Sequence, residues 1–467
     1  MAKTSARILL REQKELAKWE AKKAKPWQKG YYGYLLVILS VIYIMDEVTS
    51  GIRGTVQSSI VNEFFVIGRG MSFNEGLSSL TAIGMIVMLV NVLAPFYKTL
   101  SDRYGRKIFL VINTIGMGAG LLICYTSNSL VVYMAGVIIS TFFTAHDMQV
   151  IYIMETAPKK LRGTIYASIK CIASLGVVLI PVLRSIFMGD DPTRWRAIFL
   201  VPGLMGFAIG IWTLLGAKET PYFLENRIAF LKSTPEERAA KAREEGLKKE
   251  NGKGGIVKAF RFMFQHKQLR GLVFSNILFF FAVGGINSYE SIMTTVGGMS
   301  TDMVTQALFV YPFVNAFITL MNGILADKIG RKKVAVTMSA ISLCTFILFI
   351  FSVRGGGWNP YLVGGLYGCY VGSFWAVGDV IGGIMCAESA PTKLRASVVG
   401  AQAFLVLVGV LVSTALFSVG LRIIPNISTL CLILMAPPMI ASLIVLTAKV
   451  SDTKGIDLNT VTGSEWD

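Results

Sequence analysis

Long apolar segments alternate with short polar ones along almost the whole chain of 467 residues. A helix needs about 20 apolar residues to cross the hydrocarbon core of a bilayer, and twelve segments approach or exceed that length. The pattern therefore predicts an all-α membrane protein with twelve transmembrane helices. The expected spans are 32–60, 77–98, 108–127, 130–154, 164–188, 195–216, 271–295, 304–325, 334–353, 360–387, 397–421 and 427–448.

One polar segment, 217–270, is much longer than the others and is rich in Lys, Glu and Arg. Six expected spans precede it and six follow it, which indicates two six-helix bundles joined by an exposed helical linker. The expected organisation is a basic N-terminal segment (1–30), a first bundle (31–216), the linker (217–270), a second bundle (271–450) and a tail (451–467).

The composition agrees with this class, and the distribution of charge gives an orientation. Hydrophobic residues make up 53% of the chain, charged residues only 16%, and the formal net charge is +17. Of the 45 Lys and Arg residues, 37 fall in the two ends and the loops that a twelve-span chain places on one side. The positive-inside rule then predicts that both termini and the linker are cytoplasmic, in a multi-pass protein of the cell membrane. Because no soluble basic domain is present, nucleic acid is excluded as a partner.

The N-terminal segment 1–30 holds nine Lys or Arg and three Glu, without the apolar core of a cleavable signal peptide. The stretch Ala6–Trp19 fits an amphipathic helix at the inner membrane surface and fits a solvated tail equally well.

Two short motifs occur twice, in the same order. Ser101-Asp-Arg-Tyr-Gly-Arg-Lys107 follows the second span and Ala326-Asp-Lys-Ile-Gly-Arg-Lys332 the eighth. Glu155-Thr-Ala-Pro-Lys-Lys-Leu-Arg162 follows the fourth span and Glu388-Ser-Ala-Pro-Thr-Lys-Leu-Arg395 the tenth. The two copies of each motif are separated by nearly the same length of chain, so the second bundle is expected to repeat the first.

With these motifs the chain resembles the major facilitator superfamily, and within it the sugar porters and related metabolite transporters. The Asp-Arg-x-Gly-Arg-Lys loop and the Glu-x-x-Pro-x-x-x-Arg elements carry the resemblance, together with Lys218-Glu-Thr-Pro-Tyr-Phe-Leu224. It implies two pseudo-symmetric bundles that expose one solute site alternately to each side.

The repeated motifs are expected to form a cytoplasmic gate. Gly105 and Gly330 suit a tight turn with positive φ, and Asp102 and Asp327 suit charge-assisted bonds from Arg residues and helix N-termini of the neighbouring half. The candidate gate residues are Asp102, Arg103, Gly105, Arg106, Glu155, Arg162, Glu219, Asp327, Gly330, Arg331, Glu388 and Arg395.

Ionisable residues inside a membrane are costly and therefore indicate a task. The candidates for proton coupling are Asp46, His146, Glu290 and Asp379. By the resemblance, Asp46 matches the protonation site of proton-coupled sugar porters, whereas Ala135 stands where those relatives have an Arg on the fourth span. A partly desolvated carboxylate without that Arg could exchange a proton near neutral pH. The alternative role for Asp46 is a structural ion pair with Arg53.

The candidate residues of a solute cavity are Tyr43, Glu47, Arg53, Asp147, Lys170, Asn287, Tyr289 and Trp375. By the resemblance, Asn287 matches a sugar-binding Asn, but Phe281 and Ala282 replace the Gln pair that bonds sugar hydroxyls. An organic ion or another polar metabolite is therefore expected rather than a hexose. Ordinary helix packing explains the aromatic members equally well.

The sequence thus predicts a secondary transporter of a small organic solute, coupled to protons and acting as a monomer. A uniporter or antiporter of the same fold, or a sensor that binds without transport, are the alternatives. Neither an enzyme's set of catalytic groups nor an ATP-binding loop occurs, and no cofactor or metal is expected.

Overall fold

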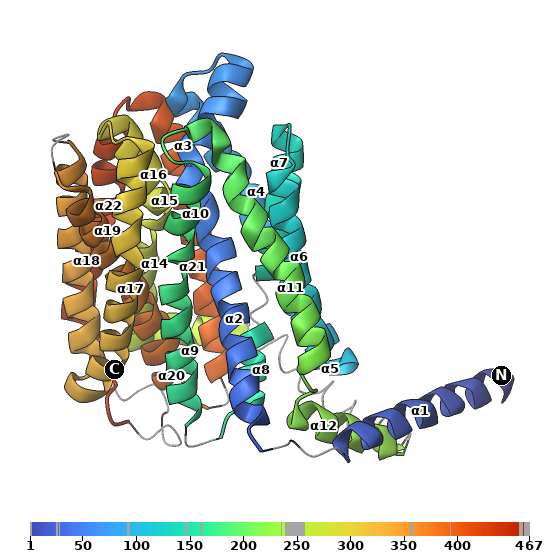
Figure 1. Ribbon diagram of the computed structural model, residues 1–467. Helices are drawn as coiled ribbons and strands as arrows, with labels where there is room; N and C mark the ends of the chain where they lie inside the picture. Colours follow the sequence, from blue (N-terminus) through green and yellow to red (C-terminus); the bar gives the residue numbers. More distant parts are fainter. Residues whose placement is uncertain are drawn as a thin grey trace. The chain divides into compact units, whose positions relative to one another are not determined.

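The structure is a computed structural model, and it describes residues 2–24, 27, 29–90, 94–144, 148–158, 161–234, 236–238, 257–354, 358–392, 394–456 and 461. All regular secondary structure in these residues is helical (Figure 1). In chain order the elements are α1 (Ala2–Lys23), α2 (Tyr31–Gly51), η1 (Ile52–Val56), α3 (Gln57–Val61), η2 (Asn62–Ile67), α4 (Phe73–Val90), α5 (Ala94–Tyr104), α6 (Arg106–Tyr125), α7 (Leu130–Thr144), α8 (Met148–Thr156), α9 (Arg162–Gly176), α10 (Leu179–Phe187), η4 (Pro192–Phe199), α11 (Leu200–Gly216), α12 (Pro221–Lys232), α14 (Lys267–Phe280), α15 (Val283–Ile286), α16 (Tyr289–Ser291), η5 (Ile292–Val296), α17 (Thr301–Ile329), α18 (Arg331–Arg354), α19 (Pro360–Gly378), η6 (Asp379–Met385), α20 (Cys386–Glu388), α21 (Arg395–Ile423) and α22 (Ile427–Lys449).

Eleven helical stretches of the described chain are long and apolar enough to cross a membrane. They correspond to eleven of the twelve predicted spans. The remaining span, 271–295, is divided among α14, α15, α16 and the π-helical η5. Gly284 and Gly285 lie at this interruption, and glycine weakens a helix because it leaves the backbone more freedom to lose.

Side-chain caps set the start of several helices. Asn359 accepts a hydrogen bond from the backbone of Tyr361 at the start of α19, and Asn426 caps α22 in the same way. Thr220 caps α12, with Pro221 in the first helical position. Each cap satisfies a backbone N–H that the helix itself leaves without a partner.

The chain divides into two compact units. Unit 1 holds residues 1–50, 87–173 and 199–251, in which α6 packs against both α7 and α11. Unit 2 holds residues 51–86, 174–198 and 252–467. Its core joins α14–α22 around buried aromatic rings, of which Phe279 stacks on Phe374 and Tyr289 on Tyr367. Parts of four predicted first-half spans thus pack in the same unit as the second half; they are 51–60, 77–86, 174–188 and 195–198. The proposed bundles at 31–216 and 271–450 are a different division, and they stay a prediction.

Candidate functional site: two repeated polar networks and two buried carboxylates

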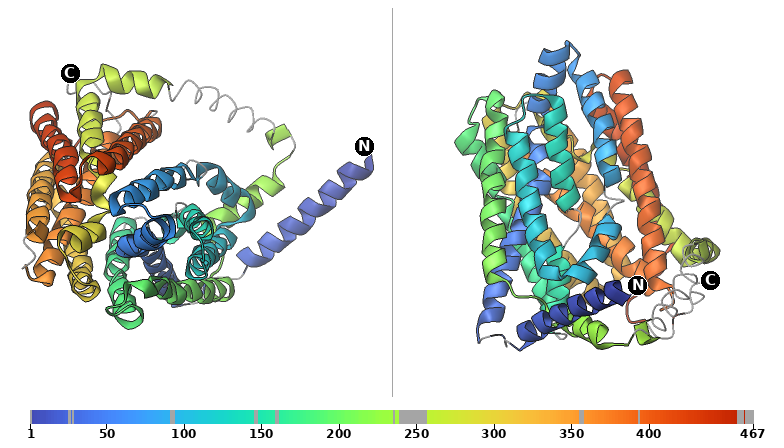
Figure 2. Two further views of the ribbon diagram at one scale, coloured as in Figure 1. Left: turned by 90° about the horizontal axis from the view of Figure 1, so that it is seen from above. Right: turned by 90° about the vertical axis from the view of Figure 1, so that its right-hand side faces the viewer.

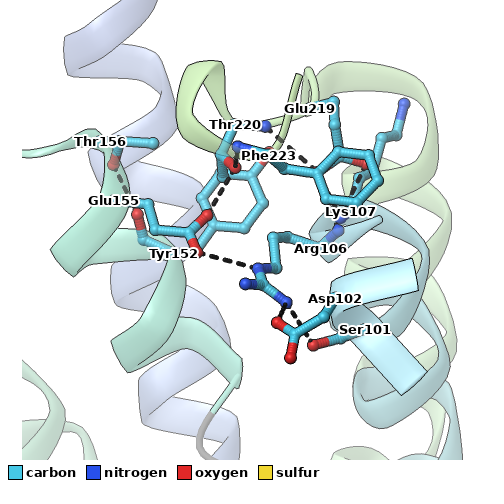
Figure 3. A network of polar contacts seen from close by, with 10 residues as sticks. All are labelled: Ser101, Asp102, Arg106, Lys107, Tyr152, Glu155, Thr156, Glu219, Thr220 and Phe223. Atoms are coloured by element: carbon cyan, nitrogen blue, oxygen red, sulfur yellow. Dashed lines mark hydrogen bonds and ion pairs between the residues drawn. The ribbon is translucent and has the colours of Figure 1, made fainter. Parts of the chain in front are cut away.

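A polar network surrounds Arg106, the first residue of α6 (Figure 3). The Nη1 atom of Arg106 donates to Ser101 Oγ at 2.7 Å and lies 2.5 Å from Asp102 Oδ1. The Nε atom of the same guanidinium donates to Glu155 Oε1 at 2.9 Å. The guanidinium is buried and binds two carboxylates, so its charge is compensated at close range. We call Ser101, Asp102, Arg106, Glu155, Glu219 and Thr220 the Arg106 network.

Glu219 caps the N-terminus of α6 from a distant part of the chain. Its Oε1 accepts from the backbone N–H groups of Arg106 at 2.9 Å and Lys107 at 3.1 Å. Gly105 precedes α6 and has a φ of 110° and a ψ of 151°, a combination that only glycine adopts readily. Because glycine has no side chain, it cannot cap these backbone donors itself. A Cβ at Gly105 would collide with the Glu219 carboxylate. The positive φ predicted for Gly105 therefore also makes room for the carboxylate that caps the helix.

The environment of Glu219 acts on its charge in two directions. Burial raises the pKa of Glu219 above its ordinary value, because the carboxylate is only 6% exposed. The backbone donors of Lys107, Thr220 and Arg106 oppose that change without cancelling it. Glu219 therefore takes up a proton more readily than an exposed Glu does.

Thr220 connects the network to α12. Its Oγ1 donates to Glu155 Oε2 at 2.6 Å and accepts from the backbone N–H of Phe223 at 3.3 Å (Figure 3). The hydroxyl thus ties the end of the fourth span to the first turn of the helix that follows the sixth.

Unit 2 contains the same arrangement around Arg331. Arg331 Nη2 lies 3.3 Å from Asp327 Oδ1, and Nε lies 3.4 Å from Glu388 Oε1. Asp452 Oδ1 accepts from the backbone N–H groups of Arg331 at 3.0 Å and Lys332 at 3.4 Å. We call Asp327, Arg331, Glu388, Asp452 and Thr453 the Arg331 network. Gly330, with φ of 105°, again precedes the capped helix, and a Cβ there would collide with Asp452.

Asp452 and Thr453 were not among the predicted gate residues, because they fall in the predicted C-terminal tail. Thr453 Oγ1 donates to Glu388 Oε2 at 2.5 Å, as Thr220 does to Glu155. A signal was present, since Glu219 and Asp452 are separated by the same length of chain as Glu155 and Glu388. The single Glu-Thr and Asp-Thr pairs are too short to stand out without the contacts.

Three other gate candidates lie apart from the central contacts of the networks. Arg103 packs over Tyr104, 5.5 Å from its ring. Arg395 donates from Nε to the backbone carbonyl of Ala387 at 2.9 Å. Arg162 begins α9, and its buried Nε makes no hydrogen bond with the described residues. Asp102 and Asp327 each bind the Arg four residues later in their own motif.

Asp46 lies on α2 in unit 1 and is 8% exposed. Gln149, on α8 of the predicted fourth span, donates from Nε2 to Asp46 Oδ2 at 3.1 Å. The fourth span therefore does supply a partner for this carboxylate, although it comes from Gln149 rather than from position 135. Gln149 was not predicted, because a neutral amide in an apolar segment does not stand out. Arg53, the alternative partner considered for Asp46, lies on η1 in unit 2.

Glu290 is buried in unit 2, where it joins segments from the two halves of the sequence. It accepts from the backbone N–H of Ser58 at 2.7 Å and from Ser58 Oγ at 2.5 Å. Arg184, only 1% exposed, attracts the Glu290 charge and donates from Nε to Thr305 Oγ1 at 3.1 Å and from Nη1 to the carbonyl of Thr55. Arg184 lies near a loop in the sequence, and its burial was not apparent from that position.

The remaining cavity candidates are divided between the two units. In unit 1, Tyr43 is buried and Glu47 and Lys170 are partly exposed. In unit 2, Tyr289 is buried next to Glu290, whereas Asn287, Trp375 and Asp379 are exposed. His146 and Asp147 lie outside the described residues. A single cavity that gathers these side chains therefore stays a prediction.

Long apolar helices, two copies of one polar network and buried carboxylates on helices expected to cross the membrane define a multi-pass membrane transporter. The family model of the Major Facilitator Superfamily matches residues 32–414, and the chain belongs to this family. The predicted family and fold class are confirmed, and the chain is a transporter rather than an enzyme.

Proteins similar to this chain are named as transporters. A "Probable metabolite transport protein CsbC" of Bacillus subtilis is 24% identical over 351 residues, which cover 69% of this chain and 73% of the relative. The "Glucose transporter GlcP" of Staphylococcus epidermidis is 20% identical over 398 residues, which cover 81% of this chain and 87% of the relative. Among solved structures, a "D-xylose-proton symporter" superposes with a TM-score of 0.60 at 20% identity, covering 92% of this chain and all of the other.

Proposed function

We propose that this chain is a proton-coupled secondary transporter that moves a small organic ion or polar metabolite across the cell membrane by alternating access. One observation carries the proposal. In unit 2, buried polar side chains from the first half of the sequence bind directly to side chains from the second half. We call these the cross-half contacts; they are Ser58 with Glu290, Arg184 with Thr305, and Ser78 with Ser418 and Arg422.

The cross-half contacts lie within a few turns of the loops at 68–72, 188–191 and 424–426. In the sequence, those loops lie at the opposite ends of the predicted spans from the two repeated motifs. A buried polar group satisfied by a partner can separate from it only when water replaces that partner. The contacts are therefore suited to a gate that excludes water when it is closed and is hydrated when it is open. Alternating access requires such a gate on each side of the solute site.

Asp46 and Gln149 support coupling to protons. The Gln149 amide can donate to the ionised carboxylate through its NH₂ and can accept from the protonated one through its carbonyl. Asp46 would therefore keep a hydrogen-bond partner in both protonation states. Glu290 is the second candidate, in the cross-half contacts.

The substrate class follows from the polar groups available. The similarity to proteins named as metabolite and glucose transporters supports a small polar solute as the cargo. The set of neutral side chains that bonds a hexose is incomplete here, since Phe281 and Ala282 occupy the two positions between α14 and α15. The charge distribution favours the cell membrane with cytoplasmic termini, and a monomer is sufficient for this mechanism.

The test begins with a thermal-shift screen of organic ions and polar metabolites on the purified protein, because a bound solute raises the unfolding temperature. The hit is then used in proteoliposomes with an imposed pH gradient. Asp46→Asn keeps the side-chain shape without a titratable group. We expect it to lose gradient-driven accumulation by tenfold or more while retaining exchange of labelled for unlabelled solute.

Gln149→Leu is the companion variant, and it should weaken accumulation less than Asp46→Asn does. Full accumulation by Asp46→Asn would move the coupling site to another group, with Glu290 next. Wild-type flux that ignores the pH gradient would identify a uniporter, and ligand binding without any flux a sensor.

A further inference from the structure

The N-terminal helix α1 has one strongly basic face. Its cations recur at intervals of four, four, three, four and four residues, which places them on one side of a helix with 3.6 residues per turn. Lys14, Lys18 and Lys22 are exposed. We call these three lysines the basic stripe. Lys3, Arg7 and Arg11 continue the same spacing in the sequence.

A neighbouring face of α1 packs against α12, and Lys18 and Lys22 lie over the ring of Trp19 at its edge. Trp19 is 5% exposed and lies in an apolar cluster with Phe223 and Leu224, at 5.2 Å from the Phe223 ring. Three ion pairs involve the acidic residues of α1. They join Glu15 to Arg227 at 2.8 Å, Glu20 to Lys232 at 2.7 Å, and Glu12 to Arg238 at 2.9 Å.

Within α1, Glu15 attracts Lys18, and each Glu of the helix forms its ion pair with a cation outside the stripe. The three Glu residues of the helix are all paired with cations that follow the sixth span. Partial burial and the neighbouring charge of Lys18 lower the pKa of Lys22, and the charge of Glu219 opposes this change in part. A further anion beside the stripe would relieve the remaining repulsion between Lys18 and Lys22.

The position of α1 in unit 1 indicates where that anion lies. Figures 1 and 2 show α1 beside α12, running across the axes of α6 and α11 rather than along them. Because α6 and α11 are expected to cross the bilayer, a helix perpendicular to them runs along the membrane surface. Its 22 residues extend for about 33 Å.

We propose that the basic stripe of α1 binds anionic phospholipid headgroups and thereby holds α1 and α12 at the membrane surface. Headgroup phosphates form a flat anionic surface that matches a linear row of cations. Nucleic acid fits less well, since the aromatic side chain of the described helix, Trp19, is buried against α12 and offers no face for base stacking. The proposal does not rest on transport, substrate or proton coupling.

A short series of contacts connects the proposed lipid-binding helix α1 to the Arg106 network. Trp19 packs on Phe223, and the backbone N–H of Phe223 donates to Thr220, which binds Glu155. Anionic lipid is therefore expected to steady the capped start of α12 as well as α1.

The test measures amide hydrogen exchange of the full-length protein in nanodiscs. One set contains phosphatidylcholine alone, and the other contains about one third phosphatidylglycerol at the same ionic strength. A lysine near an anionic surface is worth roughly a fivefold change in an equilibrium constant. We expect residues 10–24 to exchange at least fivefold more slowly with phosphatidylglycerol, and added salt to reverse the change.

The decisive variant is Lys14→Gln with Lys18→Gln and Lys22→Gln, because Gln has a helix propensity close to that of Lys. It should remove the response to phosphatidylglycerol. The same three positions changed to Arg keep the charge and should keep the response. Equal exchange of the wild type in both lipids would overturn the proposal. The proposal would also be overturned if the Gln variant exchanged faster in both lipids and still responded to phosphatidylglycerol. The lysines would then stabilise α1 only by stacking on Trp19, whose ring lies 5.1 Å from Lys18 and 4.5 Å from Lys22.

Discussion

The Arg106 and Arg331 networks share their ion pairs and backbone caps but differ in hydrogen bonding and in surroundings. Arg106 Nε donates to Glu155, whereas Arg331 Nε makes no hydrogen bond with the described residues. In the first, the Arg side chain is 10% exposed and its carboxylate contacts are 2.5 and 2.9 Å long. In the second, the Arg side chain is 18% exposed and the contacts are 3.3 and 3.4 Å long. Glu219 is buried, whereas Asp452 is exposed. We therefore expect the same pattern of contacts to contribute a different amount to the free energy of unfolding in each copy.

The physical origin of the difference is the access of water. Carboxylates and cations that remain hydrated lose little when a partner is removed, because water replaces it. A buried charge without its partner retains the full cost of desolvation. We therefore expect every matched pair of substitutions to have the larger effect in the Arg106 network.

The largest effect is expected from Arg106→Met compared with Arg331→Met. Arg106→Met leaves the Glu155 carboxylate, whose side chain is 11% exposed, without its cation and should lower the free energy of unfolding by about 3 kcal/mol. Arg331→Met should lower it by about 1 kcal/mol, because the Glu388 side chain is 18% exposed and its contact with Arg331 is longer. Unfolding of both purified variants in the same detergent measures the difference. Equal losses would show that burial does not separate the two networks.

A smaller effect is expected from Gly105→Ala compared with Gly330→Ala. Both residues have a positive φ that a Cβ penalises by about 1–3 kcal/mol. The new methyl group at position 105 would also press on the buried Glu219 carboxylate, whereas Asp452 is free to move into water. Gly105→Ala should therefore lower the free energy of unfolding by an amount near the upper end of this range, and Gly330→Ala by an amount near the lower end. The reverse order in thermal unfolding would contradict the proposed role of Glu219 as a rigid cap.

The smallest effect is expected from pH. Burial raises the pKa of Glu219, so the folded protein binds this proton more tightly than the unfolded chain does. The resulting contribution to stability is complete below the ordinary pKa of Glu and disappears as the pH rises through the higher, folded value. Glu219→Gln removes this titration. Its unfolding temperature should thus depend less on pH than that of the wild type just above pH 4.5. Parallel pH profiles of the two proteins would refute the role of Glu219.

The class of the protein was predictable from the order of residues alone. Twelve apolar segments, the asymmetric Lys and Arg residues and the repeated motifs were sufficient for the family and for the all-α membrane fold, because crossing a bilayer restricts length and composition so strongly. The turn glycines were also predictable, since few residues tolerate a positive φ. The basic stripe is likewise a matter of spacing along one helix.

The partners of the polar residues became known only from the packing of the helices. Gln149 reaches Asp46, Ser58 reaches Glu290, and Asp452 caps the helix that starts at Arg331. These pairs are separated by 103, 232 and 121 residues, and one member of the first two is an ordinary neutral side chain. Such contacts depend on how helices pack in three dimensions, which a pattern along the chain does not encode. The burial of a side chain likewise depends on how the helices pack. For that reason, two copies of one motif are expected to contribute differently to the free energy of unfolding.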